Sequence, residues 1–97
     1  MRAELYRNRN AGGTTTIDLE LKEDGALQLF YYDIGEAAQR SFGDSDYEAW
    51  ANVPAPEVAK LAFALLADRW RGDPQALSAF RDFCGEHGVA VESGSWT

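Results

Sequence analysis

A run of alternating residues from Thr14 to Lys22 limits most strongly what this chain can fold into. Ile17, Leu19 and Leu21 fall on one side of an extended chain, and charged or hydroxyl side chains fall on the other. A period of two is typical of a strand with one buried face. A second run, from Leu27 to Asp33, follows after a short turn sequence. The two runs are therefore predicted to form an antiparallel hairpin.

The turn between these strands decides their register. A two-residue loop at Asp24-Gly25 would place Leu21 opposite Gln28 and mix apolar with polar side chains. A three-residue loop, Glu23 to Gly25, pairs apolar residues throughout: Leu21 with Leu27, Leu19 with Leu29, and Ile17 with Tyr31. It also puts Gly25 at the left-handed position of a bulged turn, where glycine is favoured. We therefore predict the three-residue loop, which leaves Phe30 and Tyr32 on the opposite face.

Four further segments up to Val53 have recognisable patterns. Glu4–Arg7 is predicted to be a short first strand and Asn8–Gly13 a loop. Gly35–Phe42 is predicted to be a short helix or helical turn with Gly43 as its C-cap. The fourth, Tyr47–Val53, alternates again and is predicted to be a strand. Glu48, Trp50 and Asn52 would share one side of that strand.

Helical spacing dominates the rest of the chain. Pro56 opens a helix that runs to about Trp70 and stops at Gly72. Asp73-Pro74 is predicted to cap and start a second helix, which Gly88 ends. The apolar stripe of this second helix is Leu77, Phe80, Phe83 and Cys84, and Val89–Val91 follows it as a short closing strand.

This order predicts an α+β fold in one compact domain over residues 1–97. We expect an antiparallel sheet of about five strands with two helices packed on one face. The elements run strand, strand, strand, short helix, strand, helix, helix, strand, without a linker or an internal repeat.

Charge and cysteine content exclude several classes of function. The chain has a net charge of −7 and a pI near 4.5, which argues against direct nucleic-acid binding and against anionic membrane surfaces. Arginine outnumbers lysine seven to two, which suggests a GC-rich bacterial gene. The single Cys84 rules out an internal disulfide. Without a signal-like apolar segment near its start, the chain is expected to be cytoplasmic.

Catalytic and metal-binding patterns are weak, so the sequence favours a binding module over an enzyme and predicts neither a metal nor a cofactor. Cys84 and His87 lie three residues apart on one helical face, but a buried packing cysteine is the more ordinary interpretation. One cysteine and one histidine cannot complete a zinc site. The segment beginning Asp44-Ser45-Asp46 resembles the start of a calcium loop, yet alanine stands at its sixth and twelfth places. A carboxylate site would need Asp33 and the acids of 44–48 to converge.

Acidic and aromatic residues share the middle of the chain. The segment from Ile17 to Glu57 contains ten acidic residues and two basic ones, which gives a local net charge of −8. Aromatic side chains dominate binding hot spots, and acidic groups around them attract a basic partner. The residues we expect to bind that partner are Tyr32, Asp44, Asp46, Glu48 and Trp50.

In size, charge and α+β order the chain resembles the small acidic bacterial proteins that include toxin-neutralising immunity proteins. The resemblance implies an inhibitor or regulator of a basic protein. Three alternatives stay open: an acidic nucleic-acid mimic, a self-associating structural protein that uses Trp50 or Trp96, and a small carboxylate-based enzyme. Whether the chain is a monomer or a dimer is also open.

Overall fold

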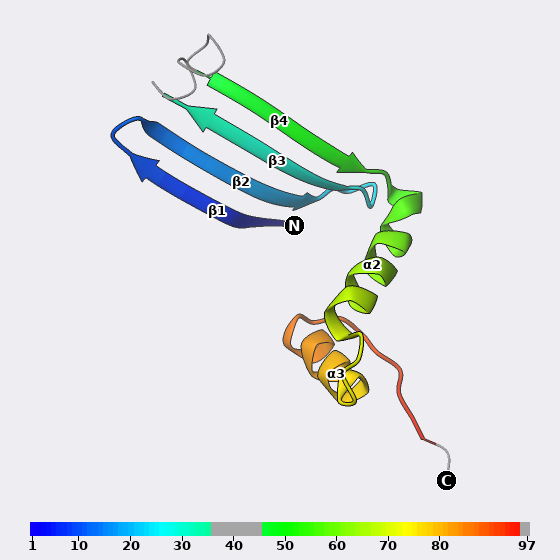
Figure 1. The fold of residues 1–97 in the computed structure, drawn as a ribbon. Helices are drawn as coiled ribbons and strands as arrows, with labels where there is room; N and C mark the ends of the chain where they lie inside the picture. The colour runs from blue at the N-terminus through cyan, green and yellow to red at the C-terminus, as the bar shows by residue number, and fades with distance from the viewer. Residues whose placement is uncertain (36–45, 96–97) are drawn as a thin grey trace. The chain divides into compact units, whose positions relative to one another are not determined.

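The computed structural model describes residues 1–35 and 46–95 and confirms the α+β class. Four strands come first: β1 (Arg2–Asn10), β2 (Gly13–Leu21), β3 (Leu27–Ile34) and β4 (Asp46–Val53). Two helices follow, α2 (Ala55–Trp70) and α3 (Ala76–Glu86) (Figure 1). The chain divides into two compact units, here the sheet unit (Met1–Leu61) and the helical unit (Ala62–Thr97).

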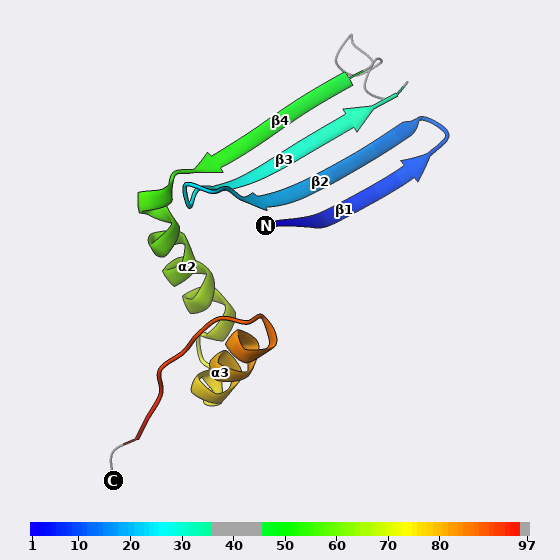
Figure 2. The ribbon, with the colours of Figure 1, turned by 180° about the vertical axis from the view of Figure 1, so that it is seen from behind.

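The sheet is an antiparallel meander in which the strands lie side by side in chain order, as both sides show (Figures 1 and 2). The register predicted for the second hairpin is confirmed, because Leu21 pairs with Leu27, Leu19 with Leu29, and Ile17 with Tyr31. The Lys22 amide donates to the Ala26 carbonyl at 2.8 Å and encloses the predicted three-residue loop. Gly25 has a φ of 91°, the left-handed conformation that this loop requires.

β1 is longer than the sequence indicated. The segment predicted to be a loop, Asn8–Gly13, continues the hairpin, so that Arg9 pairs with Thr14 and only Ala11 and Gly12 form the turn. A bulge interrupts β1 between Glu4 and Tyr6. The bulge shifts the β1–β2 register by one residue, so the charged residues of this strand do not alternate with a continuous period of two.

Two glycines allow the first turn to lie against the end of β3. A Cβ on Gly13 would stand 1.9 Å from the Ile34 carbonyl oxygen, and a Cβ on Gly35 would stand 2.3 Å from the Gly12 carbonyl oxygen. Both glycines also have positive φ, 135° and 128°. The backbone at Gly12–Gly13 approaches the backbone at Ile34–Gly35 more closely than a side chain at either glycine would permit.

Cross-strand pairing divides the sheet into two faces. The apolar face carries Ala3, Tyr6, Ile17, Leu19, Leu21, Leu27, Leu29, Tyr31, Ala49, Ala51 and Val53. The polar face carries Arg2, Glu4, Arg7, Arg9, Asp18, Glu20, Phe30, Tyr32, Asp46, Glu48 and Trp50. In this structure most of the apolar-face side chains are half-buried, whereas Ala3, Tyr6, Leu29 and Ala51 are exposed.

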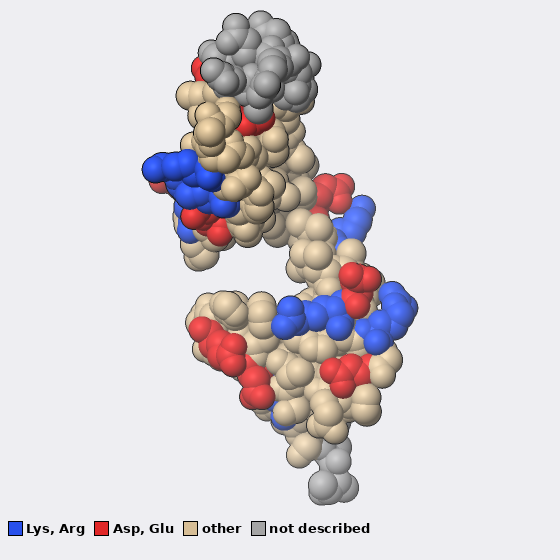
Figure 3. Space-filling model, turned by 60° about the vertical axis from the view of Figure 1, so that its left-hand side comes forward, with Lys and Arg blue, Asp and Glu red and all other residues tan. Residues whose placement is uncertain are grey.

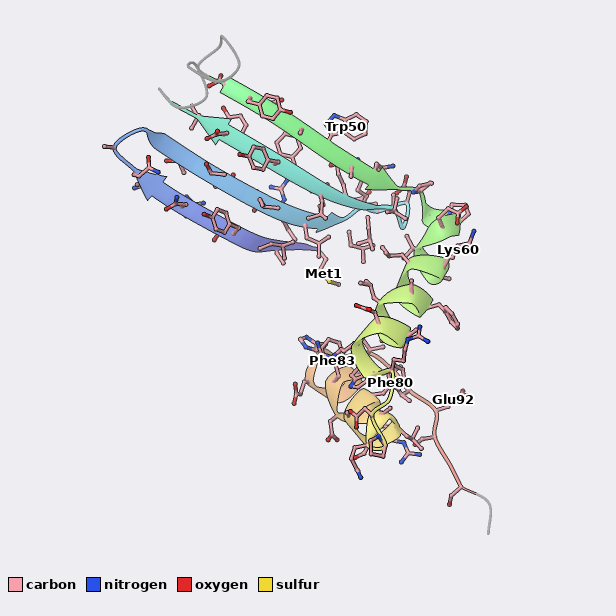
Figure 4. All side chains as sticks on the ribbon, in the orientation of Figure 1. Met1, Trp50, Lys60, Phe80, Phe83 and Glu92 are labelled. Atoms are coloured by element: carbon pink, nitrogen blue, oxygen red, sulfur yellow. The ribbon has the colours of Figure 1, made fainter. Side chains whose placement is uncertain are left out.

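Aromatic packing defines the helical unit. The Trp70 ring meets Phe80 and Phe83 edge-on, with centroids 5.9 and 6.0 Å apart, and Figure 4 labels both phenylalanines on α3. The Arg69 guanidinium lies 5.1 Å from the Trp70 ring centre and 5.0 Å from that of Phe83. Cys84, 5% exposed, is buried on this stripe as predicted.

Both predicted helix stops are confirmed, because Gly72 and Gly88 have φ of 78° and 69°. The predicted start of the second helix is wrong. Asp73 accepts a hydrogen bond from the Gln75 amide at 2.8 Å and forms a turn, and α3 begins only at Ala76 with Gln75 as its N-cap. Asp73-Pro74 therefore belongs to a local turn that directly precedes the helix.

The fifth strand predicted at Val89–Val91 is also wrong, because this segment has no regular secondary structure. Its three residues are too few to hold a strand without a partner edge. The predicted short helix at Gly35–Phe42 falls, apart from Gly35, outside the described residues, as do Gly43, Asp44 and Trp96. The packing of the two helices on one face of the sheet stays a prediction.

Candidate binding surface

The register of β3 and β4 brings four of the predicted partner-binding residues onto one face. Tyr32 pairs directly with Glu48, and Asp46 and Trp50 lie two residues to either side of Glu48 on the same strand face. Phe30 pairs with Trp50 and adds a further ring. We call these five residues the acidic–aromatic surface. The fifth predicted residue, Asp44, lies outside the described residues.

Trp50 is the most exposed of the three aromatic residues of this surface. Its side chain is 65% exposed and projects away from the strand in Figure 4. Asp46 and Glu48 are exposed beside it, whereas Phe30 and Tyr32 are half-buried. The Phe30 and Tyr32 rings stack with their centroids 6.5 Å apart and an interplanar angle of 26°. The surface thus combines a half-buried pair of stacked rings with an exposed tryptophan.

The ionisation of Tyr32 reports how close the acids lie. Partial burial raises the pKa of the Tyr32 hydroxyl above its ordinary value of 10.0, and the negative charges of Asp46 and Glu48 raise it further. Both effects disfavour a phenolate at this position. Tyr32 therefore stays a neutral hydrogen-bond donor next to two carboxylates at physiological pH.

The carboxylates that a hydrolytic site would need are not brought together in the part of the chain that the structure describes. Asp33 pairs with Tyr47 on the side of the sheet opposite to Asp46 and Glu48. There it accepts a hydrogen bond from the Thr15 hydroxyl at 2.9 Å. Tyr47 itself lies edge-on to Tyr31, 6.0 Å between ring centres. No group of three potential metal-ligating side chains occurs among the described residues.

Cys84 and His87 have separate structural roles in the helical unit. The Cys84 carbonyl accepts the Val89 amide at 2.8 Å in the turn that ends α3. His87 is the C-cap of that helix, and its ring packs against Phe83 at 4.3 Å between centres. Both residues take part in helix termination, and among the described residues neither side chain forms a hydrogen bond or ion pair with a third group that would orient it for catalysis.

The basic cluster of Arg2, Arg7 and Arg9 is evident in the sequence, and the structure adds that these arginines of β1 lie on the same sheet face as the acidic–aromatic surface. Arg7 pairs with Thr16 and Arg9 with Thr14, in the same cross-strand rows as Tyr32 and Ile34. Arg2 forms an ion pair with Glu20 at 3.2 Å, beside a shallow hollow of about 210 Å³ that Asp18, Gln28 and Phe30 also line. Figure 3 shows basic and acidic side chains next to each other on this unit.

On the polar face the arginines therefore lie on the edge strand β1, and Asp46 and Glu48 lie on the opposite edge strand β4. Two further acids of this face, Asp18 and Glu20, lie on β2. The signal was available in the spacing of Arg7 and Arg9, two residues apart like Asp46 and Glu48. The shared face was not predicted because the bulge at Leu5 breaks the alternation and because Arg9 fell in the segment predicted to be a loop.

The comparisons with known proteins give no family. The chain matches no protein-family model, no curated protein and no solved structure. Within the described residues, no helix has the length and apolar character needed to cross a bilayer. Function has to be argued from the surface itself.

Proposed function

We propose that this protein is a binding module that captures a basic protein through its acidic–aromatic surface, as an immunity protein or another inhibitor would. The observation that carries the proposal is the pairing of β3 with β4. It puts two carboxylates, a tyrosine hydroxyl and a largely exposed tryptophan on one continuous patch.

Each component suits recognition of a cationic surface. The tryptophan buries a large area on binding while few side-chain rotations are lost, and it can stack under an arginine or lysine of the partner. Exposed carboxylates accelerate encounter with a basic partner and contribute less as salt rises. Among the described residues neither Asp46 nor Glu48 has an ion-pair partner within the chain. Both charges are available to an incoming protein.

The same register weakens the nucleic-acid mimic as an alternative. A mimic needs a long series of carboxylates spaced like phosphates, whereas Arg2, Arg7 and Arg9 occupy the other end of this face. A DNA-binding protein would meet like charge there.

The test is capture of partners from bacterial lysate on the immobilised protein, with two pairs of matched variants. Glu48→Lys is compared with Glu23→Lys, the same charge change on the exposed β2–β3 loop. Trp50→Ala is compared with Phe63→Ala, which removes another exposed aromatic ring, 75% exposed, from α2. We expect one basic protein to be retained by the two control variants and lost from the two surface variants.

Salt gives an independent readout of the same proposal. Capture should weaken when ionic strength rises from about 0.05 to about 0.5 M, because exposed charge pairs are screened within a few ångströms at the higher value. A partner that is captured equally by all four variants, or that is indifferent to salt, would show that the acidic–aromatic surface is not the binding site.

We also propose, as the finer form of the fold, that the two C-terminal helices cover the apolar face of the sheet. Each unit has exposed apolar side chains of its own, with Leu29 42% exposed in one and Leu65 59% exposed in the other. Burying such area stabilises a fold by about 25 cal/mol per Å². Nuclear Overhauser contacts between Ile17 methyl protons and a side chain of residues 62–91 would support this packing, and a full assignment without any would refute it.

A further inference from the structure

We propose that the β1 edge of one copy of this chain adds to the β4 edge of a second copy, which extends the antiparallel sheet from molecule to molecule. This goes beyond capture of a foreign protein and does not depend on it. The occupant of each edge is a described segment of the chain itself. Three observations carry the inference: the direction of the strands, the backbone groups at the two edges, and the charges that accompany them.

Strand direction permits the contact. The sheet has four antiparallel strands in chain order, so β1 and β4 run in opposite directions. A second copy displaced sideways by the width of the sheet therefore meets β4 with an antiparallel β1, and its apolar and polar faces continue those of the first copy. An odd number of strands would have produced a parallel junction instead.

The hydrogen-bond pattern identifies the free backbone groups of β4. The Lys22 amide donates to the Ala26 carbonyl, so even-numbered residues form the hydrogen-bonded pairs of the β2–β3 hairpin. Odd-numbered residues of β3 therefore bond to β4, where their partners are also odd-numbered. The peptide groups of Asp46, Glu48 and Trp50 consequently point outward from the edge.

The same reasoning identifies the free groups of β1. The Leu21 amide donates to the Met1 carbonyl at 2.8 Å, so odd-numbered residues of β2 bond to β1. Beyond the bulge at Leu5 their partners are even-numbered, which turns the peptide groups of Arg7 and Arg9 outward. Within residues 1–35 and 46–95, each edge thus offers donors and acceptors without a backbone partner, at residues whose side chains lie on the polar face.

Charge sets the register between the two copies. Arg9 and Asp46 belong to one cross-strand row of the polar face, and Arg7 and Glu48 belong to the next. Sideways displacement keeps the rows aligned, so Arg9 comes opposite Asp46 and Arg7 opposite Glu48. Arg9 has no ion-pair partner among the described residues, and Arg7 is held by Glu4 through its Nε atom at 2.6 Å. The bulge limits regular pairing to the segment after Leu5.

The opposite choice, pairing of like edges, is disfavoured. Two copies of β1 would bring together a strand that carries three arginines, and like charges placed opposite each other destabilise a strand pair. Charged side chains and a bulge are also common devices that keep edges apart. Here they protect β1 from another β1 and leave it complementary to β4.

The contact is heterologous, so each added copy exposes a new free edge. We therefore expect a series of oligomers whose mean mass rises with concentration. The measurement is sedimentation equilibrium of the complete chain from about 10 μM to about 1 mM, at low and at high ionic strength. Association should be seen at low ionic strength and fall at least tenfold in apparent affinity at high ionic strength.

Two charge-reversal variants test the pairing. Arg7→Glu/Arg9→Glu changes the net charge by −4, from −7 to −11, and Asp46→Lys/Glu48→Lys changes it by +4, to −3. Each variant should fail to associate with itself, and an equimolar mixture should recover association. Both variants are net negative, so attraction between their net charges cannot account for recovery.

A control variant keeps the result interpretable. Arg71→Glu/Arg81→Glu gives the same net charge of −11 by substitution in the helical unit, and it should associate like the original chain. Circular dichroism checks that all variants keep their secondary structure. A wild-type chain that stays monomeric at low salt overturns the proposal. So does association that ignores both salt and the reversals, which would point to the apolar face, and so does a mixture that fails to recover.

Discussion

Different kinds of contact stabilise the sheet unit and the helical unit. In the sheet, residues far apart in sequence are paired one by one, and the apolar residues Ile17, Leu19 and Leu21 stay on one face with their partners on the neighbouring strands. In the helical unit, two helices meet through one aromatic cluster around Trp70, with Cys84 as its buried residue. The comparison suggests that a substitution in the sheet acts on the whole ladder, whereas one in the helices acts locally.

The sharpest contrast between the units comes from one glycine in each. Gly13→Ala places a methyl group within 1.9 Å of the Ile34 carbonyl oxygen at a φ of 135°. We expect it to destabilise the sheet unit by about 3 kcal/mol or more, since a strained φ alone costs about 1–3 kcal/mol. Gly85→Ala meets nothing within 4 Å inside α3 and should stabilise it by about 0.5–1 kcal/mol.

Urea denaturation followed by circular dichroism measures both glycine variants. If the two substitutions changed the free energy of unfolding in the same direction, the close approach of the first turn to the end of β3 would be wrong. Hydrogen exchange separates the units within each variant, because amides of β2 and of α3 are followed individually.

Neighbouring positions on the two faces of β2 give the next largest effect. Leu19→Asn removes an apolar side chain from the apolar face and introduces an amide without a partner. We expect a loss of about 2–3 kcal/mol. Glu20→Asn, on the polar face, should cost below about 1 kcal/mol because it removes only the exposed ion pair with Arg2. Equal losses in thermal or urea unfolding would mean that the apolar face stays exposed to water.

The helical unit should respond to loss of one ring of its cluster. Phe83→Ala removes contacts with Trp70, with the Arg69 guanidinium and with His87. Because Phe83 is half-buried, we expect a cost of about 1–2 kcal/mol, less than for a ring in a closed core. Leu77→Ala on the same helix is the control, since Leu77 is 64% exposed. Protection of α3 amides should fall in Phe83→Ala and not in the control.

The two units also differ in how far the sequence predicts them. The alternation of Ile17, Leu19 and Leu21 with one glycine at the turn was enough to give the correct register, because a slip of one residue would invert every side chain. The same rule put Glu48 and Trp50 on one side of their strand, and the pairing of β3 with β4 that brings Tyr32 to the same face came from the structure. The rule failed at the bulge by Leu5, where the period breaks, so the full length of β1 and the sheet face of its arginines were not predicted.

In the helical unit the stops were predictable, and two boundaries were not. Glycines at 72 and 88 end helices by a backbone property that belongs to the residue itself. Asp73-Pro74 fits both a turn and a helix cap, and the competition between them depends on contacts that no local pattern encodes. Val89–Val91 has strand-forming residues, yet a strand exists only where another edge accepts it.

The smallest expected effect is also the most direct probe of the acidic–aromatic surface. Partial burial and the charges of Asp46 and Glu48 raise the pKa of Tyr32, so the folded state holds its proton at pH values where an unfolded tyrosine, with a pKa near 10, has begun to lose it. The unfolded state then binds fewer protons than the folded state. The contribution of Tyr32 to stability is therefore complete below pH 10 and is lost as pH rises through its folded pKa.

Titration of Tyr32 by NMR should give a lower pKa in Asp46→Asn/Glu48→Gln than in the original chain, with a remaining elevation that is due to burial. An unchanged pKa would mean that the two carboxylates do not lie beside the hydroxyl, and the surface would then lose its acidic half.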